Sequence, residues 1–295
     1  MVTQNKVSRT YLKYLLALIL FGFNGIVANY LSLNSYEIVF LRTLIGSAFL
    51  AVIFLCTRGK QQRSKNKKHI VYLAISGIAM GMSWMFLYEA YSELGVSVAT
   101  LAYYCGPVIV MLLSPFLFRE RLTIRKILGF LLVLTGMYFV NGKALQQNGF
   151  SWELICGILS AVLYAVMVIS NKKASSITGL GNSVLQLTFS FIIVTAFMQI
   201  KQGLIIPSLI ENIVPVLILG IMNTGIGCYL YFSSIQKLPA GSVAICGYLE
   251  PFSALVFSAI FLQERLAAIQ VIGAALILCG AAFVEFSAYK NRSGQ

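Results

Sequence analysis

The chain has 295 residues, of which 59% are hydrophobic and 11% charged, and its mean hydropathy is +0.85. One soluble core cannot bury so large a share of apolar side chains, so the composition excludes an ordinary soluble domain and indicates a membrane protein. A net charge of +13 is also found in nucleic-acid-binding proteins. The positions of the basic residues along the chain distinguish that role from membrane topology.

Apolar runs long enough to cross a bilayer, about 20 residues each, recur from Tyr11 to Phe286. They predict an all-α membrane protein with ten transmembrane helices and short loops. The first run follows basic residues, as in a signal peptide, but it is too long and lacks a small-residue cleavage site, so we expect it to be retained. The predicted spans are 11–31, 36–56, 70–91, 96–118, 124–141, 152–170, 182–201, 212–234, 241–262 and 266–286.

Basic residues concentrate in the segments that alternate spans place on one side of the membrane. With the N-terminus inside, that side holds 18 of the 22 Lys and Arg residues, and the others are Arg42, Lys143, Lys201 and Arg265. Because cytoplasmic loops are enriched in Lys and Arg, this asymmetry predicts cytoplasmic termini in a multi-pass protein of the plasma membrane. We interpret the basic run at 58–69 as a topology anchor that favours anionic lipids, and not as a nucleic-acid site.

The cysteines and the single histidine form no metal or redox motif. His69 follows two lysines at the membrane boundary, which is too little to indicate a pH sensor. The sequence therefore predicts no metal and no cofactor. The six cysteines lie singly in apolar spans, without CxxC or Cys/His spacing, and we interpret them as packing residues: Cys56, Cys105, Cys156, Cys228, Cys246 and Cys279.

The chain aligns with itself at an offset of 144 residues. The stretch YYCGPVIVMLLSPFLFRERL (103–122) matches GYLEPFSALVFSAIFLQERL (247–266), and the match extends on both sides. The identical pairs include Tyr104/Tyr248, Pro107/Pro251, Ser114/Ser258, Glu120/Glu264, Arg121/Arg265 and Leu122/Leu266. Shared hydrophobicity alone does not produce such a series, so the chain contains an internal duplication.

The duplication divides the chain into two five-helix halves, 1–147 and 148–295. Since five is an odd number, the second half enters the membrane from the opposite side, which places Glu120 inside and Glu264 outside. Inverted-topology repeats of this kind are a common construction of secondary transporters, with the substrate site near the midplane between the halves.

These motifs resemble the EamA-type branch of the drug/metabolite transporter superfamily. The likeness covers nearly the whole chain and rests on LEPFSALVFSAIFLQERL, on CGPVIVMLLSPFLFRERLT and on FLRTLIGSAFL, which contains Arg42. The resemblance implies a secondary carrier built of two five-span repeats, often an exporter of amino acids or other small metabolites, that works without ATP. The sequence agrees, since it has no phosphate-binding GxxxxGK[ST] loop.

Glu250 is a carboxylate inside an apolar span, beside Pro251. It follows Gly241 by nine residues, which places it about 14 Å into a hydrocarbon core about 30 Å thick. A charged group there is costly in lipid, so it faces the bundle interior or a wet cavity, or is protonated. Three roles stay open: hydrogen bonding to backbone groups freed by the proline, proton coupling, and a counter-charge for a substrate ammonium group. The equivalent residue of the first half is Gly106.

Pro107 and Pro251 are expected to kink matching helices near the midplane and so to free backbone groups that line a cavity. Aromatic residues at helical spacing provide a wall for a bulky, partly apolar substrate, although the same spacing suits ordinary helix packing. Polar residues inside spans either line this path or bond a neighbouring helix. The predicted substrate-cavity residues are Asn24, Trp84, Tyr88, Tyr103, Tyr104, Tyr164, Asn223, Tyr248 and Glu250.

Other charged residues in the spans and at the helix ends are expected to form ion pairs. Arg42 and Glu89 lie in the outer thirds of their spans, and we predict an ion pair between them that is structural or forms an outer gate. The Glu–Arg pairs of RERL and QERL are expected to fasten helix ends at the interface.

The sequence therefore predicts a proton-coupled or facilitative exporter of small metabolites, functional as a monomer in the lipid bilayer by alternating access. An uptake permease or nucleotide-sugar carrier of the same superfamily is the near alternative. An intramembrane enzyme is disfavoured, because no HExxH, GxSxG or aspartate is present. A membrane scaffold is disfavoured because few exposed elements exist for partners to bind.

Overall fold

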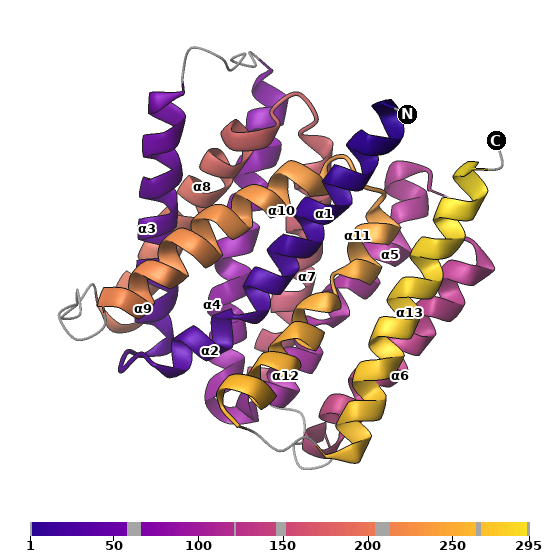
Figure 1. Cartoon of the computed structure of the whole chain (residues 1–295). Coiled ribbons are helices and arrows are strands. Elements are labelled where there is room, and N and C mark those ends of the chain that lie inside the picture. The colour runs from indigo at the N-terminus through magenta and orange to yellow at the C-terminus, as the bar shows by residue number, and fades with distance from the viewer. Residues whose placement is uncertain are drawn as a thin grey trace.

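The computed structural model describes residues 2–57, 66–120, 122–145, 152–203, 213–263 and 267–293. All regular secondary structure within these ranges is helical, and both chain termini lie at the same end of the bundle (Figure 1). The first part of the chain forms α1 (Val2–Gly22), α2 (Asn24–Asn29), α3 (Ser35–Cys56), α4 (Lys67–Tyr103), α5 (Cys105–Phe118) and α6 (Ile124–Leu145). The second part forms α7 (Trp152–Lys173), α8 (Gly179–Gln202), α9 (Ile213–Leu217), the π-helix η1 (Ile218–Ile226), α10 (Gly227–Ile235), α11 (Ala240–Cys246), α12 (Leu249–Phe261) and α13 (Ala268–Ser293).

The helices account for the predicted spans. Seven stretches of the described chain are long and apolar enough to cross a membrane, and they coincide with the predicted first, second, third, sixth, seventh, eighth and ninth spans. The predicted fourth and tenth spans contain the shorter apolar helices Cys105–Phe118 and Ala268–Gly280, and the fifth corresponds to α6. The expectation of an all-α membrane protein is confirmed, with seven of the ten predicted crossings meeting the criteria of length and hydropathy.

α4 carries the predicted third span and the start of the fourth. A Cβ added to Gly157 of α7 would lie 3.8 Å from the Ala90 side chain and 2.9 Å from that of Ala102. In a straight helix, residues this far apart in sequence are separated by about 18 Å. Ala90 and Ala102 both lie near Gly157, so the chain turns back between them.

Helix interruptions fall at equivalent places in the two halves. Tyr104 separates α4 from α5, and Gly247 and Tyr248 separate α11 from α12. The predicted single helices over 96–118 and 241–262 are therefore broken in two. Pro107 and Pro251 each occupy the third position of the helix after the break, where a missing backbone N–H costs no intrahelical hydrogen bond.

Reciprocal contacts show how the two repeats are related. A Cβ on Gly136 of α6 would lie 2.5 Å from the Gly273 carbonyl oxygen, and a Cβ on Gly280 of α13 would lie 2.5 Å from that of Gly129. Gly273 and Gly280 are the equivalents of Gly129 and Gly136 at the repeat offset. A self-complementary contact of this kind requires a two-fold axis and pairs α6 and α13 antiparallel (Figure 1). The second repeat is therefore inverted relative to the first.

The interruptions themselves meet near this axis. The Tyr248 hydroxyl donates to the Tyr104 carbonyl oxygen at 2.7 Å, and these residues are 144 positions apart. The duplication extends to backbone conformation, since the equivalent residues Arg119 and Gln263 both have φ of 56° after α5 and α12. A left-handed residue at this position is a common way to end a helix.

Candidate functional site

A cavity of about 970 Å³ penetrates the bundle from one end. Residues at helix ends line its mouth, among them Asn34, Gln202, Leu262 and Gln270. The helix ends that carry these residues lie at the end of the bundle away from the chain termini (Figure 1). The cavity reaches Tyr164, in the middle of α7. Its volume suits a small metabolite, since ligand cavities commonly span about 300–1,000 Å³.

The structure brings most of the predicted cavity residues together. Tyr248 is an exception, because its side chain is fully buried and its hydroxyl is bonded to the Tyr104 backbone. Asn223 is the other exception, because its amide donates to Asn24 Oδ1 at 2.9 Å and to the Leu20 carbonyl oxygen at 3.1 Å. Both polar groups are satisfied by a neighbouring helix instead of facing the path. The predicted residues that line the cavity are Asn24, Trp84, Tyr88, Tyr103, Tyr104, Tyr164 and Glu250.

Sequence reasoning missed the contribution of α10. Cys228, Tyr231 and Phe232 line the cavity, and they lie 144 residues after Trp84, Leu87 and Tyr88. The repeat offset is the signal that identifies them, because equivalent helices of inverted repeats face the same central space.

Tyrosines form the deepest part of the cavity. The hydroxyls of Tyr164 and Tyr231 lie 3.2 Å apart, and the Tyr103 ring packs edge-on against Tyr164 with 5.5 Å between ring centroids. Tyr14 packs behind Tyr231 at 5.5 Å. Such a surface offers large apolar contact area together with hydroxyls that accept or donate hydrogen bonds.

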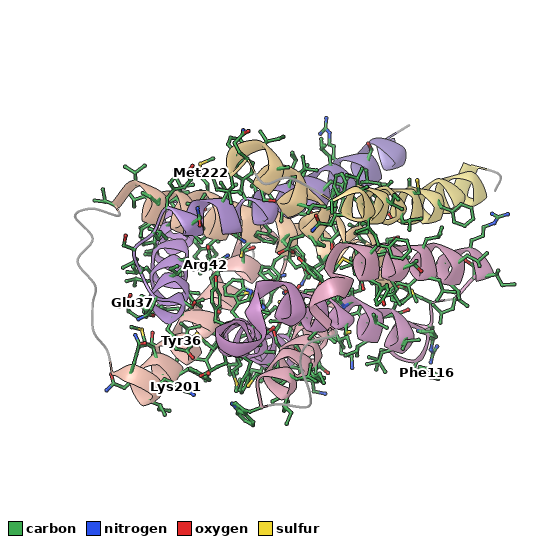
Figure 2. The ribbon with its side chains drawn as sticks, turned by 90° about the horizontal axis from the view of Figure 1, so that it is seen from below. Tyr36, Glu37, Arg42, Phe116, Lys201 and Met222 are labelled. Atoms are coloured by element: carbon green, nitrogen blue, oxygen red, sulfur yellow. The ribbon has the colours of Figure 1, made fainter. Side chains whose placement is uncertain are left out.

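Arg42 projects from α3 into the interior, where only 6% of it is exposed (Figure 2). Its Nε donates to Thr224 Oγ1 of η1 at 3.0 Å, and the guanidinium carbon lies 4.6 Å from the centre of the Trp84 ring. Contacts from two different helices, η1 and α4, therefore fix the position and the plane of this guanidinium. One of them is a π-helix, and π-helical turns often occur at functional sites.

The predicted pair between Arg42 and Glu89 is wrong. Glu89 forms an ion pair with Lys201 Nζ at 2.6 Å, whereas Arg42 donates a hydrogen bond to Thr224. Hydropathy places Arg42 and Glu89 at similar depths, but it carries no information on which helix faces each of them. Lys201, at the last turn of α8, lies closer to the Glu89 carboxylate.

Glu250 is the second residue of α12, and its side chain lines the cavity. The carbonyl group of Gly247, which Pro251 cannot bond, accepts from the Glu250 backbone N–H at 3.2 Å. No donor among the residues that the structure describes hydrogen-bonds to the Glu250 carboxylate, so this side chain does not satisfy the interrupted backbone. Arg42 lines the same cavity as Glu250. These two are the only charged side chains in the described cavity lining.

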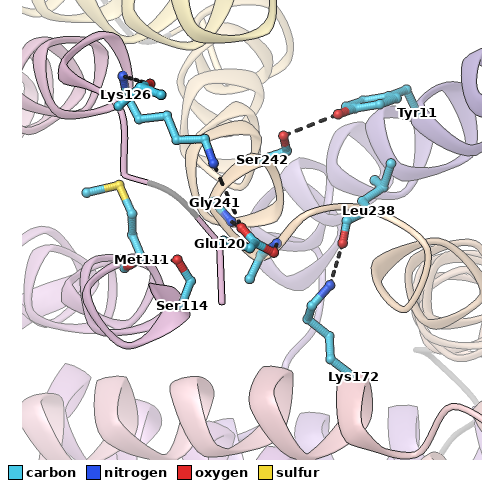
Figure 3. Close-up of polar contacts among 11 residues, drawn as sticks. Tyr11, Met111, Ser114, Glu120, Lys126, Lys172, Leu238, Gly241 and Ser242 are labelled. Carbon is cyan, nitrogen blue, oxygen red and sulfur yellow. Dashed lines mark hydrogen bonds and ion pairs between the residues drawn. The ribbon is translucent and has the colours of Figure 1, made fainter. Parts of the chain in front are cut away.

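Glu120 follows α5 at the end of the bundle that carries the termini, and Figure 3 shows its polar contacts. Its two carboxylate oxygens accept from the backbone N–H groups of Ala240 at 2.5 Å and Gly241 at 3.1 Å, at the start of α11. Lys126 Nζ lies 3.8 Å from the same carboxylate. Glu120 thus binds the first repeat to the second. The expected partner Arg121 and the QERL pair Glu264 and Arg265 lie outside the described residues.

Other contacts close the same end. The Tyr11 hydroxyl donates to Ser242 Oγ at 3.2 Å, and the Tyr14 hydroxyl donates to the Val243 carbonyl oxygen at 2.8 Å. Lys172 Nζ donates to the carbonyl oxygens of Ile235, at 3.0 Å, and Leu238. None of these seven residues lines the cavity, which in the described part of the protein is therefore open at one end and closed at the other.

Comparison with known proteins agrees with this architecture. A model of the EamA-like transporter family matches the chain twice, at residues 8–142 and 151–286. The chain is 26% identical over 297 residues to "Uncharacterized transporter YxxF" of Bacillus subtilis (strain 168), covering 95% of this chain and 91% of that protein. It is also 26% identical to an "Uncharacterized transporter" of Helicobacter pylori (strain J99), with 93% of each covered. A crystal structure of a protein 20% identical in sequence shares the fold, with a TM-score of 0.79 over 96% of this chain and 98% of that one.

Proposed function

We propose that this chain, which belongs to the EamA-like transporter family and is therefore a membrane transporter, exports small, partly apolar metabolites such as amino acids. Export takes place by alternating access. The observation that carries the proposal is the cavity, which is open at one end and closed at the other by contacts between the two repeats. A carrier needs a central site that one gate exposes at a time, and inverted repeats supply two equivalent gates.

The charge pattern supports an orientation. Because cytoplasmic loops are enriched in Lys and Arg, the basic loops support a closed end that faces the cytoplasm of a plasma-membrane protein, and we propose that the cavity here faces outward. In the alternate state the Glu120 contacts break, the cytoplasmic end opens, and the mouth near Asn34 and Leu262 closes. Export is the proposed direction, and an uptake permease with the same geometry is the alternative. A single chain contains the whole cavity, so we propose that the monomer transports.

Glu250 is the group suited to couple this cycle to protons. Its carboxylate lines the path without a hydrogen-bond donor from the described part of the protein, so gain and loss of a proton do not break a structural contact. In that role Glu250 takes up a proton from outside in the state described here and releases it to the cytoplasm after the gates exchange. A facilitative carrier is the alternative form of the mechanism, in which Glu250 contributes only polarity.

Transport by purified protein in proteoliposomes tests the proposal. Liposomes loaded with a mixture of amino acids and other small metabolites are diluted into labelled mixture, and we expect saturable counterflow that empty liposomes lack. A pH gradient is expected to accelerate uptake by wild type and by Glu89→Gln, but not by Glu250→Gln. If no metabolite exchanges, carrier function is refuted. If Glu250→Gln still responds to the gradient, the coupling role is refuted and facilitated exchange remains.

A further inference from the structure

Arg42 has hydrogen-bonding capacity that the protein does not use. Its Nε is bonded to Thr224 and its face lies on Trp84. Neither Nη atom has a hydrogen bond or an ion pair with any residue that the structure describes. Only 6% of Arg42 is exposed. A buried cation normally pairs with an anion or remains in contact with water. Since Arg42 lines the cavity, its Nη groups face that space.

The way Arg42 is held matches the requirements of an anion site. A guanidinium presents donors in a planar fork that fits a carboxylate through two parallel hydrogen bonds. The bond from Nε to Thr224 and the stacking on Trp84 fix the plane of this fork before any ligand arrives. Fixing a charged side chain in advance lowers the entropy that binding costs.

The charge of the lining limits which anion fits. Glu250 is the other charged side chain of the described lining. When Glu250 is protonated, the single charge of Arg42 balances one carboxylate but not the double charge of a phosphate monoester. The tyrosines Tyr103, Tyr164 and Tyr231 provide apolar surface for the rest of the ligand.

We propose that the Nη groups of Arg42 bind the carboxylate of the transported substrate, which is a small monocarboxylate with an apolar body, and that Thr224 and Trp84 are positioning residues for this guanidinium. The inference rests on the proposed function, because it takes the cavity as the transport site. It adds the substrate's charged group and the residue that selects it.

Binding to the purified full-length protein tests this inference with pairs of probes that differ only in the carboxylate. Phenylalanine is compared with phenylalaninamide and leucine with leucinamide, with phenyl phosphate as a competing anion. Wild type is expected to bind at least one of the acids about 100-fold more tightly than its amide, and not to bind phenyl phosphate. Arg42→Gln is expected to remove this preference while leaving the affinity for the amide unchanged.

Four further variants separate binding from folding. Arg42→Lys keeps the charge but loses the fork, so we expect a preference of about 10-fold or less. Thr224→Val frees Nε and is expected to raise KM for the acid with little change in kcat, and Thr224→Ser is expected to restore KM. Glu89→Gln, which alters a charge near the mouth, is the matched control and is expected to bind as wild type does.

Several results overturn the inference. Equal affinity for acid and amide, loss of both affinities in Arg42→Gln, tight binding of phenyl phosphate, or no binding of either acid each contradicts a carboxylate site at Arg42. Counterflow of some metabolite in the mixture, together with any of these results, refutes the inference and leaves carrier function intact. The absence of all counterflow refutes the proposed function instead.

Discussion

Replacing Glu120 with Gln tests the gate at the closed end most directly. The Glu120 carboxylate accepts two backbone hydrogen bonds from α11, and 17% of its side chain is exposed. Charge-assisted hydrogen bonds contribute about 1.5–3 kcal/mol each, and the partial exposure favours the lower value. A neutral glutamine oxygen recovers about 1 kcal/mol. The closed state is therefore expected to lose about 2 kcal/mol relative to the open one, which is about a 30-fold shift in population.

Accessibility of a single cysteine measures this shift. Ser242, in contact with Tyr11 at the gate, is 2% exposed, so Ser242→Cys in a background without the native cysteines reports opening. Labelling by a membrane-impermeant maleimide from the side of the termini is expected to become about 30-fold faster with Glu120→Gln.

The control for this experiment is Glu37→Gln. Glu37 accepts a backbone hydrogen bond from Asn34 at 2.9 Å, but at the opposite end of the bundle, so the same chemical change there should leave the labelling rate at Ser242→Cys unaltered. An unchanged rate with Glu120→Gln, or an equal increase with Glu37→Gln, would refute the reasoning that Glu120 holds this end closed.

Two more predictions follow from the inverted repeat. Gly136→Ala places a methyl group 2.5 Å from the Gly273 carbonyl oxygen and should destabilise the protein by about 1–3 kcal/mol in thermal unfolding in detergent. Gly25→Ala, which meets nothing within 4 Å, is its control, and equal losses would contradict the close α6–α13 contact. Cysteines introduced at Arg119 and Gln263, both exposed residues that end equivalent helices, should be labelled from opposite sides of the membrane. Labelling from the same side would exclude inversion.

The helical membrane fold could be predicted because its causes are local. The length and hydropathy of each run decide whether a segment crosses a bilayer, since backbone polar groups in lipid must be satisfied within the helix. The duplication is visible as identical residues at one offset, and the odd number of predicted spans per half implies inversion. Even the missed lining residues Tyr231 and Phe232 follow from that offset.

The sites themselves depended on contacts between distant helices. Arg42 and Glu89 looked like partners by depth, but the packing of η1 and α8 gave each a different neighbour. Asn223 and Tyr248 face helix interfaces, because the rotation of a helix about its axis is set by all its neighbours together. The partners of Glu120 are backbone N–H groups, which every residue except proline carries and which no sequence pattern distinguishes. The sequence thus determined which segments cross and how the halves repeat, and only the tertiary structure decided which polar groups meet, because that depends on interhelical geometry.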